Sequence, residues 1–194
     1  MSALNLWFYR QMATWAQLLK RDEVALDYWQ RIHALQPRDP HPLATIAHMK
    51  AGKGRRTEAI ALFEQALALD SQQAGTWFNL GFVQQEEARH EQALRSFERA
   101  IELDPKLDRA YYGQALSLIK LERLEEAIAP LKKNIELQPM SPYGFYQLAH
   151  VYHRLGRAGD VATTIKRLAQ FEPNVAKQLE RETGVSVGVQ VLSP

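Results

Sequence analysis

Residues 74–107 read AGTWFNLGFVQQEEARHEQALRSFERAIELDPKL, which is two apolar-periodic segments separated by a short polar turn. Apolar residues three and four positions apart lie on one face of a helix, so each segment predicts an amphipathic helix. Small residues at facing positions would let the two helices approach closely, and a proline after the second segment cannot continue it. The positions that carry this pattern are Trp77, Leu80, Gly81, Ala93, Phe97, Ala100 and Pro105.

The same pattern recurs along the chain with a period of 34 residues. Residues 108–141 repeat the helical pattern of 74–107, and the two stretches contain the related sequences IELQP and IELDP. Extension in both directions gives five blocks without insertion, at 6–39, 40–73, 74–107, 108–141 and 142–175. The small residues of the second segments are Ala25, Ala59, Ala93, Ala127 and Val161, and the bulky residues four positions later are Trp29, Phe63, Phe97, Leu131 and Ile165. A fixed period of this length is typical of a solenoid.

The order Trp, Leu-Gly, Ala, aromatic, Ala and Pro in residues 74–107 resembles the tetratricopeptide repeat family. The resemblance implies an all-α fold, a right-handed α-solenoid of five helix-turn-helix repeats within residues 1–175. It also implies a concave inner face lined by the first helix of each pair, and a function in recognising other proteins. The fourth block departs from the family pattern, because Asn134 stands where the family has its last alanine.

Residues after the fifth block predict an end to the solenoid. The sequence NVAKQLERE predicts a polar capping helix, which we place at 176–184. Valine then alternates with small or polar residues at Val185, Val187, Val189 and Val191, which is the period of a strand. Residues 185–194 are therefore either a flexible tail or an extended segment that lies in a groove or pairs with a second copy.

The resemblance also implies which positions of each first helix line the groove. This stripe carries aromatic residues from the third block onward, two arginines and four histidines, and it carries no carboxylate. We expect it to bind a peptide or helix of a partner protein that offers apolar anchors and flanking acids, as an adaptor would. The alternative is that the aromatic residues pack on one another as an inner core. The predicted groove residues are Phe78, Asn79, Phe82, Arg109, Tyr112, Tyr143, Tyr146, His150 and Arg154.

The first helix is apolar on almost its whole circumference, which is typical of a helix buried on several sides. Either it docks on another subunit, a second copy of the chain included, or it packs against the first block. The predicted interface residues are Trp7, Phe8 and Trp15. A structural subunit that is built into a larger complex through this helix is thus the second functional hypothesis.

Composition and motifs argue against several functional classes. The 24 lysines and arginines nearly balance the 22 aspartates and glutamates, so the charge does not predict a nucleic-acid partner. The chain has no cysteine, and His150 and His153 lack a third ligand in their motif, so we predict no metal site and no cofactor. No catalytic signature or apolar run of membrane-spanning length is present, which predicts a non-enzymatic, cytoplasmic protein without a membrane span.

Overall fold

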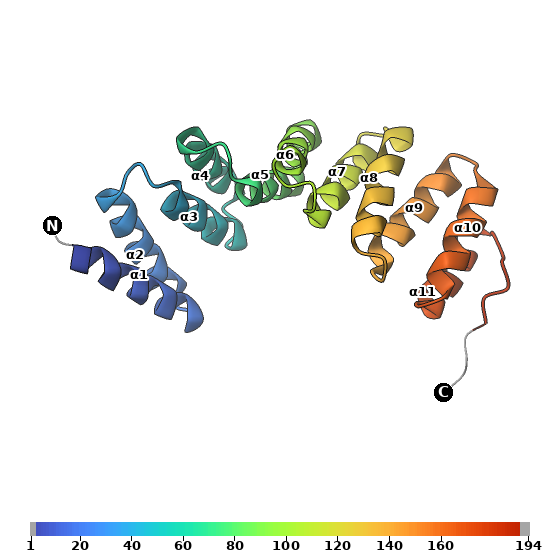
Figure 1. Ribbon diagram of the computed structural model, residues 1–194, viewed down its shortest axis with the longest axis horizontal. Coiled ribbons are helices and arrows are strands. Elements are labelled where there is room, and N and C mark those ends of the chain that lie inside the picture. The colour runs from blue at the N-terminus through green and yellow to red at the C-terminus, as the bar shows by residue number, and fades with distance from the viewer. Residues whose placement is uncertain (1–2, 191–194) are drawn as a thin grey trace. The chain divides into compact units, whose positions relative to one another are not determined.

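The computed structural model describes residues 3–190, which form eleven helices and no strand (Figure 1). The prediction of an all-α solenoid is confirmed. None of the helices among these residues is long and apolar enough to cross a membrane. The chain divides into two compact units, of which the first ends at Asp104 and the second begins at Pro105. Each repeat of a solenoid contacts only its neighbours, so such a chain need not form one central core.

The first unit consists of three helix pairs in which each helix packs on the next one in sequence. Its helices are α1 (Ala3–Leu18), α2 (Asp22–Leu35), α3 (Pro40–Gly52), α4 (Arg56–Leu69), α5 (Ala74–Glu86) and α6 (His90–Leu103). One apolar cluster joins α1, α2 and α3 around Trp29 and Ile32. A second cluster joins α3, α4 and α5 around Phe63, which is fully buried. The periodic bulky residues of the sequence therefore fill the space between successive helices.

The second unit contains two helix pairs and one further helix. Its helices are α7 (Asp108–Lys120), α8 (Leu124–Leu137), α9 (Pro142–Arg154), α10 (Ala158–Ala169) and α11 (Pro173–Thr183). Helix α9 packs on both α8 and α10, and α11 packs on α10 and α9. Phe145 of α9 is buried and its ring lies 5.5 Å from that of Phe171, which follows α10.

The turn inside each helix pair contains one residue with a left-handed backbone. These residues lie 34 positions apart and have φ angles between 55° and 75°: Lys20, Gly54, Ala88, Glu122 and Gly156. Glycine adopts this conformation without steric cost, whereas the other three residues do so at the expense of some strain. The backbone thus repeats with the sequence, while the exact boundaries of the five blocks stay a prediction.

Asn134 departs from the family pattern, and Gly144 of the next helix accommodates it. The Asn134 side chain is buried in α8, and its Nδ2 donates a hydrogen bond to the carbonyl oxygen of Asp108 at 3.1 Å. A Cβ atom on Gly144 would lie 2.5 Å from Asn134 Oδ1 and 2.8 Å from Ile135 Cγ1. A larger residue on α8 is therefore matched by the smallest possible residue on α9.

We expect Gly144→Ala to lower the free energy of unfolding by about 1–3 kcal/mol, because the added methyl group overpacks this contact. In an Asn134→Ala background the cost should be smaller by at least about 0.5 kcal/mol, since one of the two clashing side chains is gone. Urea unfolding followed by circular dichroism measures both changes. Gly159→Ala is the control, because a Cβ at Gly159 meets nothing within 4 Å. If Gly144→Ala lowered the free energy of unfolding equally in both backgrounds, the proposed contact between Gly144 and Asn134 would be contradicted.

Helix α11 begins at Pro173, three residues earlier than the capping helix that the sequence predicts. Proline is favoured in the first turn of a helix, where its missing N–H has no partner to lose. The helix ends at Thr183, and Gly184, which caps it, adopts a left-handed conformation with φ of 70°. Ala176 and Leu179 are fully buried, so α11 covers the end of the last helix pair with its apolar side.

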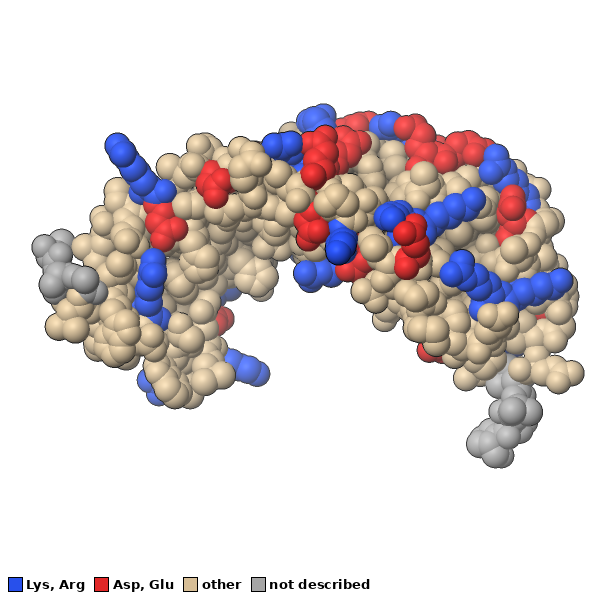
Figure 2. All heavy atoms as spheres, in the orientation of Figure 1, with Lys and Arg blue, Asp and Glu red and all other residues tan. Residues whose placement is uncertain are grey.

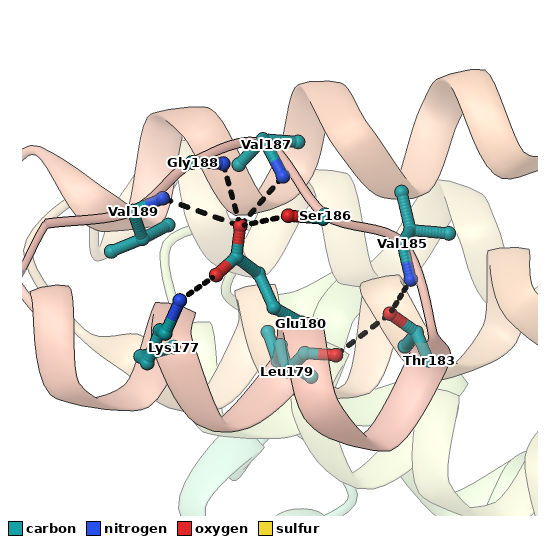
Figure 3. Close-up of polar contacts among 9 residues, drawn as sticks. All are labelled: Lys177, Leu179, Glu180, Thr183, Val185, Ser186, Val187, Gly188 and Val189. Atoms are coloured by element: carbon teal, nitrogen blue, oxygen red, sulfur yellow. Dashed lines mark hydrogen bonds and ion pairs between the residues drawn. The ribbon is translucent and has the colours of Figure 1, made fainter.

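Residues 184–190 follow α11 as an irregular segment that Glu180 holds in place (Figure 3). Glu180 Oε1 accepts hydrogen bonds from the backbone N–H groups of Val187, Gly188 and Val189 at 2.6, 2.8 and 3.2 Å. Its other oxygen pairs with Lys177 Nζ at 2.9 Å. We name these contacts the Glu180 clasp.

The valines of this segment are half-buried and the residues between them are exposed, as their alternation predicts. The described part of the segment forms no strand. It lies instead along its own unit, because the clasp engages the N–H groups that a strand would use for pairing. Val191, the last of the alternating valines, lies outside the described residues.

Candidate functional site

The aromatic pair of α5 differs in exposure between its two members. Phe82 is 50% exposed. Phe78 is half-buried and its ring lies 6.0 Å from that of Phe97 in α6. Asn79, between them, is also half-buried. Phe78 thus contributes to packing, as one of the two hypotheses predicts, whereas the Phe82 ring is exposed and remains a predicted groove residue.

In the second unit, three of the predicted groove residues line one pocket of about 120 Å³. Arg109 and Tyr112 come from α7 and Tyr143 from the first turn of α9. Tyr143 is 68% exposed, whereas burial of Tyr112 raises the pKa of its hydroxyl. A half-buried ring, an exposed ring and a guanidinium could receive an aromatic or aliphatic side chain, and Asp108 also lines the pocket beside Arg109.

Tyr146 and His150 of α9 bind a carboxylate of their own chain. The Tyr146 hydroxyl donates to Glu182 Oε2 at 2.9 Å, and His150 Nε2 lies 2.9 Å from the same oxygen. The two rings pack edge to face with centroids 4.6 Å apart. Hydrogen bonds from Gln178, Tyr146 and His150 lower the pKa of Glu182, and the bond to Glu182 raises the pKa of Tyr146. Helix α11 thus provides the acid that the sequence led us to expect from a partner.

Two arginines at or beside the predicted stripe also have acidic partners. Arg154 forms an ion pair with Glu122 of the α7–α8 turn. Arg10 of α1 lies 3.3 Å from Asp39, which precedes α3. The stripe itself carries no carboxylate, but residues outside it neutralise part of its charge, which the sequence reasoning missed. The sequence did contain a signal for these contacts. The paired residues are 29 to 36 positions apart, and residues about one repeat apart meet in a solenoid.

A larger cavity lies away from the predicted groove, among α4, α5 and α6. It has a volume of about 680 Å³ and an apolar floor that includes Leu67, Trp77 and Leu80. Arg95 and Arg99 line it as well. Its residues come mainly from second helices and from the side of α5 that faces them, so a reading of first-helix positions alone could not find it.

Charges of opposite sign lie among one another on the face that Figure 2 shows. Along the helices, ion pairs about one turn apart include Arg55 with Glu58 and Arg123 with Glu126. Within residues 3–190, no three histidine, cysteine, aspartate or glutamate side chains gather as a metal site would require.

Sequence profiles of repeat families match three stretches of the chain. Two profiles described as tetratricopeptide repeat match residues 43–75 and 74–107, and a third described as TPR repeat matches residues 115–156. The chain is a tetratricopeptide repeat protein. The second match has the same bounds as the block from which the sequence analysis started. A search of curated proteins found no match.

Several solved structures share the fold. A crystal structure of MamA has a TM-score of 0.80 and 17% sequence identity, and the match covers 100% of both chains. MamA from Desulfovibrio magneticus RS-1 has a TM-score of 0.77 and 23% identity over 92% of this chain and 96% of that one. YrrB, described as a TPR protein with an unusual peptide-binding site, has a TM-score of 0.78 and 19% identity over 89% and 90%. At these identities the likeness concerns the fold.

Proposed function

We propose that this tetratricopeptide repeat protein is an adaptor that binds a peptide or helix of a partner protein on its first helices. The family to which the chain belongs, and the peptide-binding site ascribed to the similar YrrB, support an interaction module. No covalent chemistry is required. The partner segment would offer apolar or aromatic anchors with an acidic residue beside them.

The pocket of Arg109, Tyr112 and Tyr143 is the observation that carries this proposal. It combines an accessible aromatic ring, a half-buried one and a cation within one unit. Aromatic residues and arginine are also the side chains that contribute most to binding at protein interfaces. The exposed Phe82 of α5 offers a second anchor position in the first unit. A partner could bind Tyr146 and His150 only by displacing Glu182, and Arg154 only by displacing Glu122. We therefore place these three residues at the edge of the proposed binding site.

We expect a Phe82→Ala/Tyr143→Ala variant to capture at least about tenfold less of a specific partner than the wild type, as loss of interface aromatics does. The immobilised full chain would be incubated with lysate of its native cells, and captured proteins would be quantified by mass spectrometry. Both substitutions remove exposed side chains, so the helical circular dichroism signal should not change.

Met140→Ala is the matched control, because Met140 is 68% exposed and lies outside the predicted groove. A peptide from the captured partner should compete with binding to the wild type. Equal capture by the wild type and the double variant would overturn the groove assignment.

The exposed aromatic residues of α1 favour a second function, that of a subunit built into a larger assembly. Trp7, Phe8 and Trp15 are 61%, 45% and 56% exposed. In that case a Trp7→Ala/Phe8→Ala variant, and not the groove variant, would lose the captured proteins. The same experiment therefore separates the two functions.

A further inference from the structure

Helix α1 has two apolar faces, and only one of them is covered. Ala13 and Ala16 are 0% and 5% exposed and face α2 and α3, together with Leu6 and Tyr9. On the other side lies a stripe of exposed apolar side chains, which we call the outer stripe. It consists of Leu4, Trp7, Phe8, Trp15, Leu18 and Leu19, whose exposed fractions run from 45% to 71%.

In the other first helices the position that matches Phe8 is buried, whereas the positions that match Leu4, Trp7 and Leu18 are exposed. Gly144 of α9 and Pro42 of α3, which match Phe8 in the repeat, are buried, and Gly144 lies against Asn134 and Ile135 of α8. Repeat packing therefore places small or compact residues at this position. With bulky Phe8 there, the outer stripe is not shaped for a neighbour of the repeat type.

Four residues of the outer stripe, together with Gln11, have a symmetric order along α1. Leu4, Trp7, Gln11, Trp15 and Leu18 follow one another at intervals of three, four, four and three residues. At 3.6 residues per turn they fall within an arc of roughly 80°. Gln11, the polar residue of this set, lies at its centre and is exposed.

We infer that α1 pairs with α1 of a second copy, antiparallel and about a two-fold axis at Gln11. In this arrangement Leu4 of one copy meets Leu18 of the other, and Trp7 meets Trp15. A two-fold axis presents the same surface from both copies, so a symmetric stripe is complementary to itself. The amide of Gln11 has both donors and an acceptor, so it can bond its own copy across the axis.

The charge and the exposed area of the outer stripe are both compatible with binding to a second copy of the chain. No acidic residue occurs in residues 3–21, and of the cations there, Arg10 engages Asp39 of its own chain while Lys20 and Arg21 follow the stripe at its C-terminal end. The three aromatic side chains alone expose on the order of 300 Å², taking about 150–250 Å² for a whole aromatic side chain. With the leucines added, the outer stripe approaches the roughly 600–1,000 Å² that each partner buries in a stable interface. The interface involves none of the nine predicted groove residues, but Trp7 and Leu18 stand at the repeat positions of Tyr143 and Arg154.

Disulfide crosslinking tests the pairing directly, because the chain has no cysteine of its own. Helix axes about 8–10 Å apart place the two Cα atoms of position 11 roughly 4–6 Å apart, which a disulfide can span. We expect Gln11→Cys to form a covalent dimer under mild oxidation. Thr14→Cys, an exposed position on the flank, is the matched control and should remain largely monomeric.

Mixed variants test the direction of the pairing. Tagged Leu4→Cys should crosslink with untagged Leu18→Cys, and each alone should not crosslink with itself. Self-crosslinking of Leu4→Cys would indicate a parallel arrangement and would overturn the proposal.

Sedimentation velocity of the cysteine-free chain should give the mass of a dimer. Trp7→Gln/Trp15→Gln should raise the dissociation constant by at least about thirtyfold, as interface tryptophans do. Met140→Gln/Leu69→Gln removes exposed apolar residues elsewhere and should leave the dimer intact. A monomer at all concentrations without crosslinking at position 11 would overturn the proposal. So would a monomer that binds anionic vesicles through Trp7 and Trp15, since the occupant would then be a membrane surface.

Discussion

Replacement of Phe97 by alanine is expected to lower the free energy of unfolding by about 3–5 kcal/mol, because it leaves a large cavity between α5 and α6. Phe97 is fully buried. Its ring occupies the space beside Gly81, where a Cβ atom would lie 2.9 Å from Phe97 Cε1. Phe78 contacts the same ring from the preceding turn of α5. The change therefore removes the central contact of this helix pair.

Phe82→Ala is the matched control, because it deletes the same side chain from a position that is 50% exposed. We expect this variant to lose less than about 1.5 kcal/mol, since burial of a whole phenylalanine side chain contributes roughly 1.5–3 kcal/mol. Guanidinium unfolding followed by circular dichroism gives both values, and a change of slope would reveal loss of cooperativity between the repeats. Similar losses for Phe97 and Phe82 would contradict the burial pattern.

Glu180→Gln is expected to release residues 185–190 from α11. The carboxylate is only 4% exposed and accepts three backbone hydrogen bonds in addition to its pair with Lys177. Hydrogen bonds to a buried charge contribute about 1.5–3 kcal/mol, so loss of the charge should weaken the clasp by a similar amount. Amide hydrogen exchange of Val187, Gly188 and Val189 should accelerate more than that of the α11 amides. Unchanged exchange at these three amides would contradict the clasp.

The clasp should also fail in acid. Hydrogen bonds from Lys177 and the backbone lower the pKa of Glu180 from 4.5 to about 2. Because the folded pKa is depressed, the stabilisation is complete above pH 4.5 and is lost as the pH falls toward 2. The amide chemical shifts of Val187–Val189 should titrate in that window. Glu136→Gln, a change at a carboxylate with 66% exposure, should affect neither these shifts nor the stability appreciably.

The candidate site shows how far a single sequence could be read. The spacing of Phe78 and Phe82 placed both on one face of α5, but the position of the Phe97 ring decides that the first is half-buried and the second exposed. Residue type and spacing also identified Tyr146 and His150 as predicted groove residues. Their carboxylate partner, Glu182, could not be identified, because the reach of α11 depends on how it packs on α9.

The sequence by itself determined the helices, their pairing and the period of 34, since each depends on local patterns of apolar, small and turn residues. Only the tertiary structure decided that Gly144 makes room for Asn134, that Glu180 binds the segment after α11 and that the outer stripe of α1 stays exposed. These contacts join residues on different elements, and their geometry follows from the angle and distance at which the elements pack. Periodicity defines the faces of a helix, and packing decides which of those faces is covered.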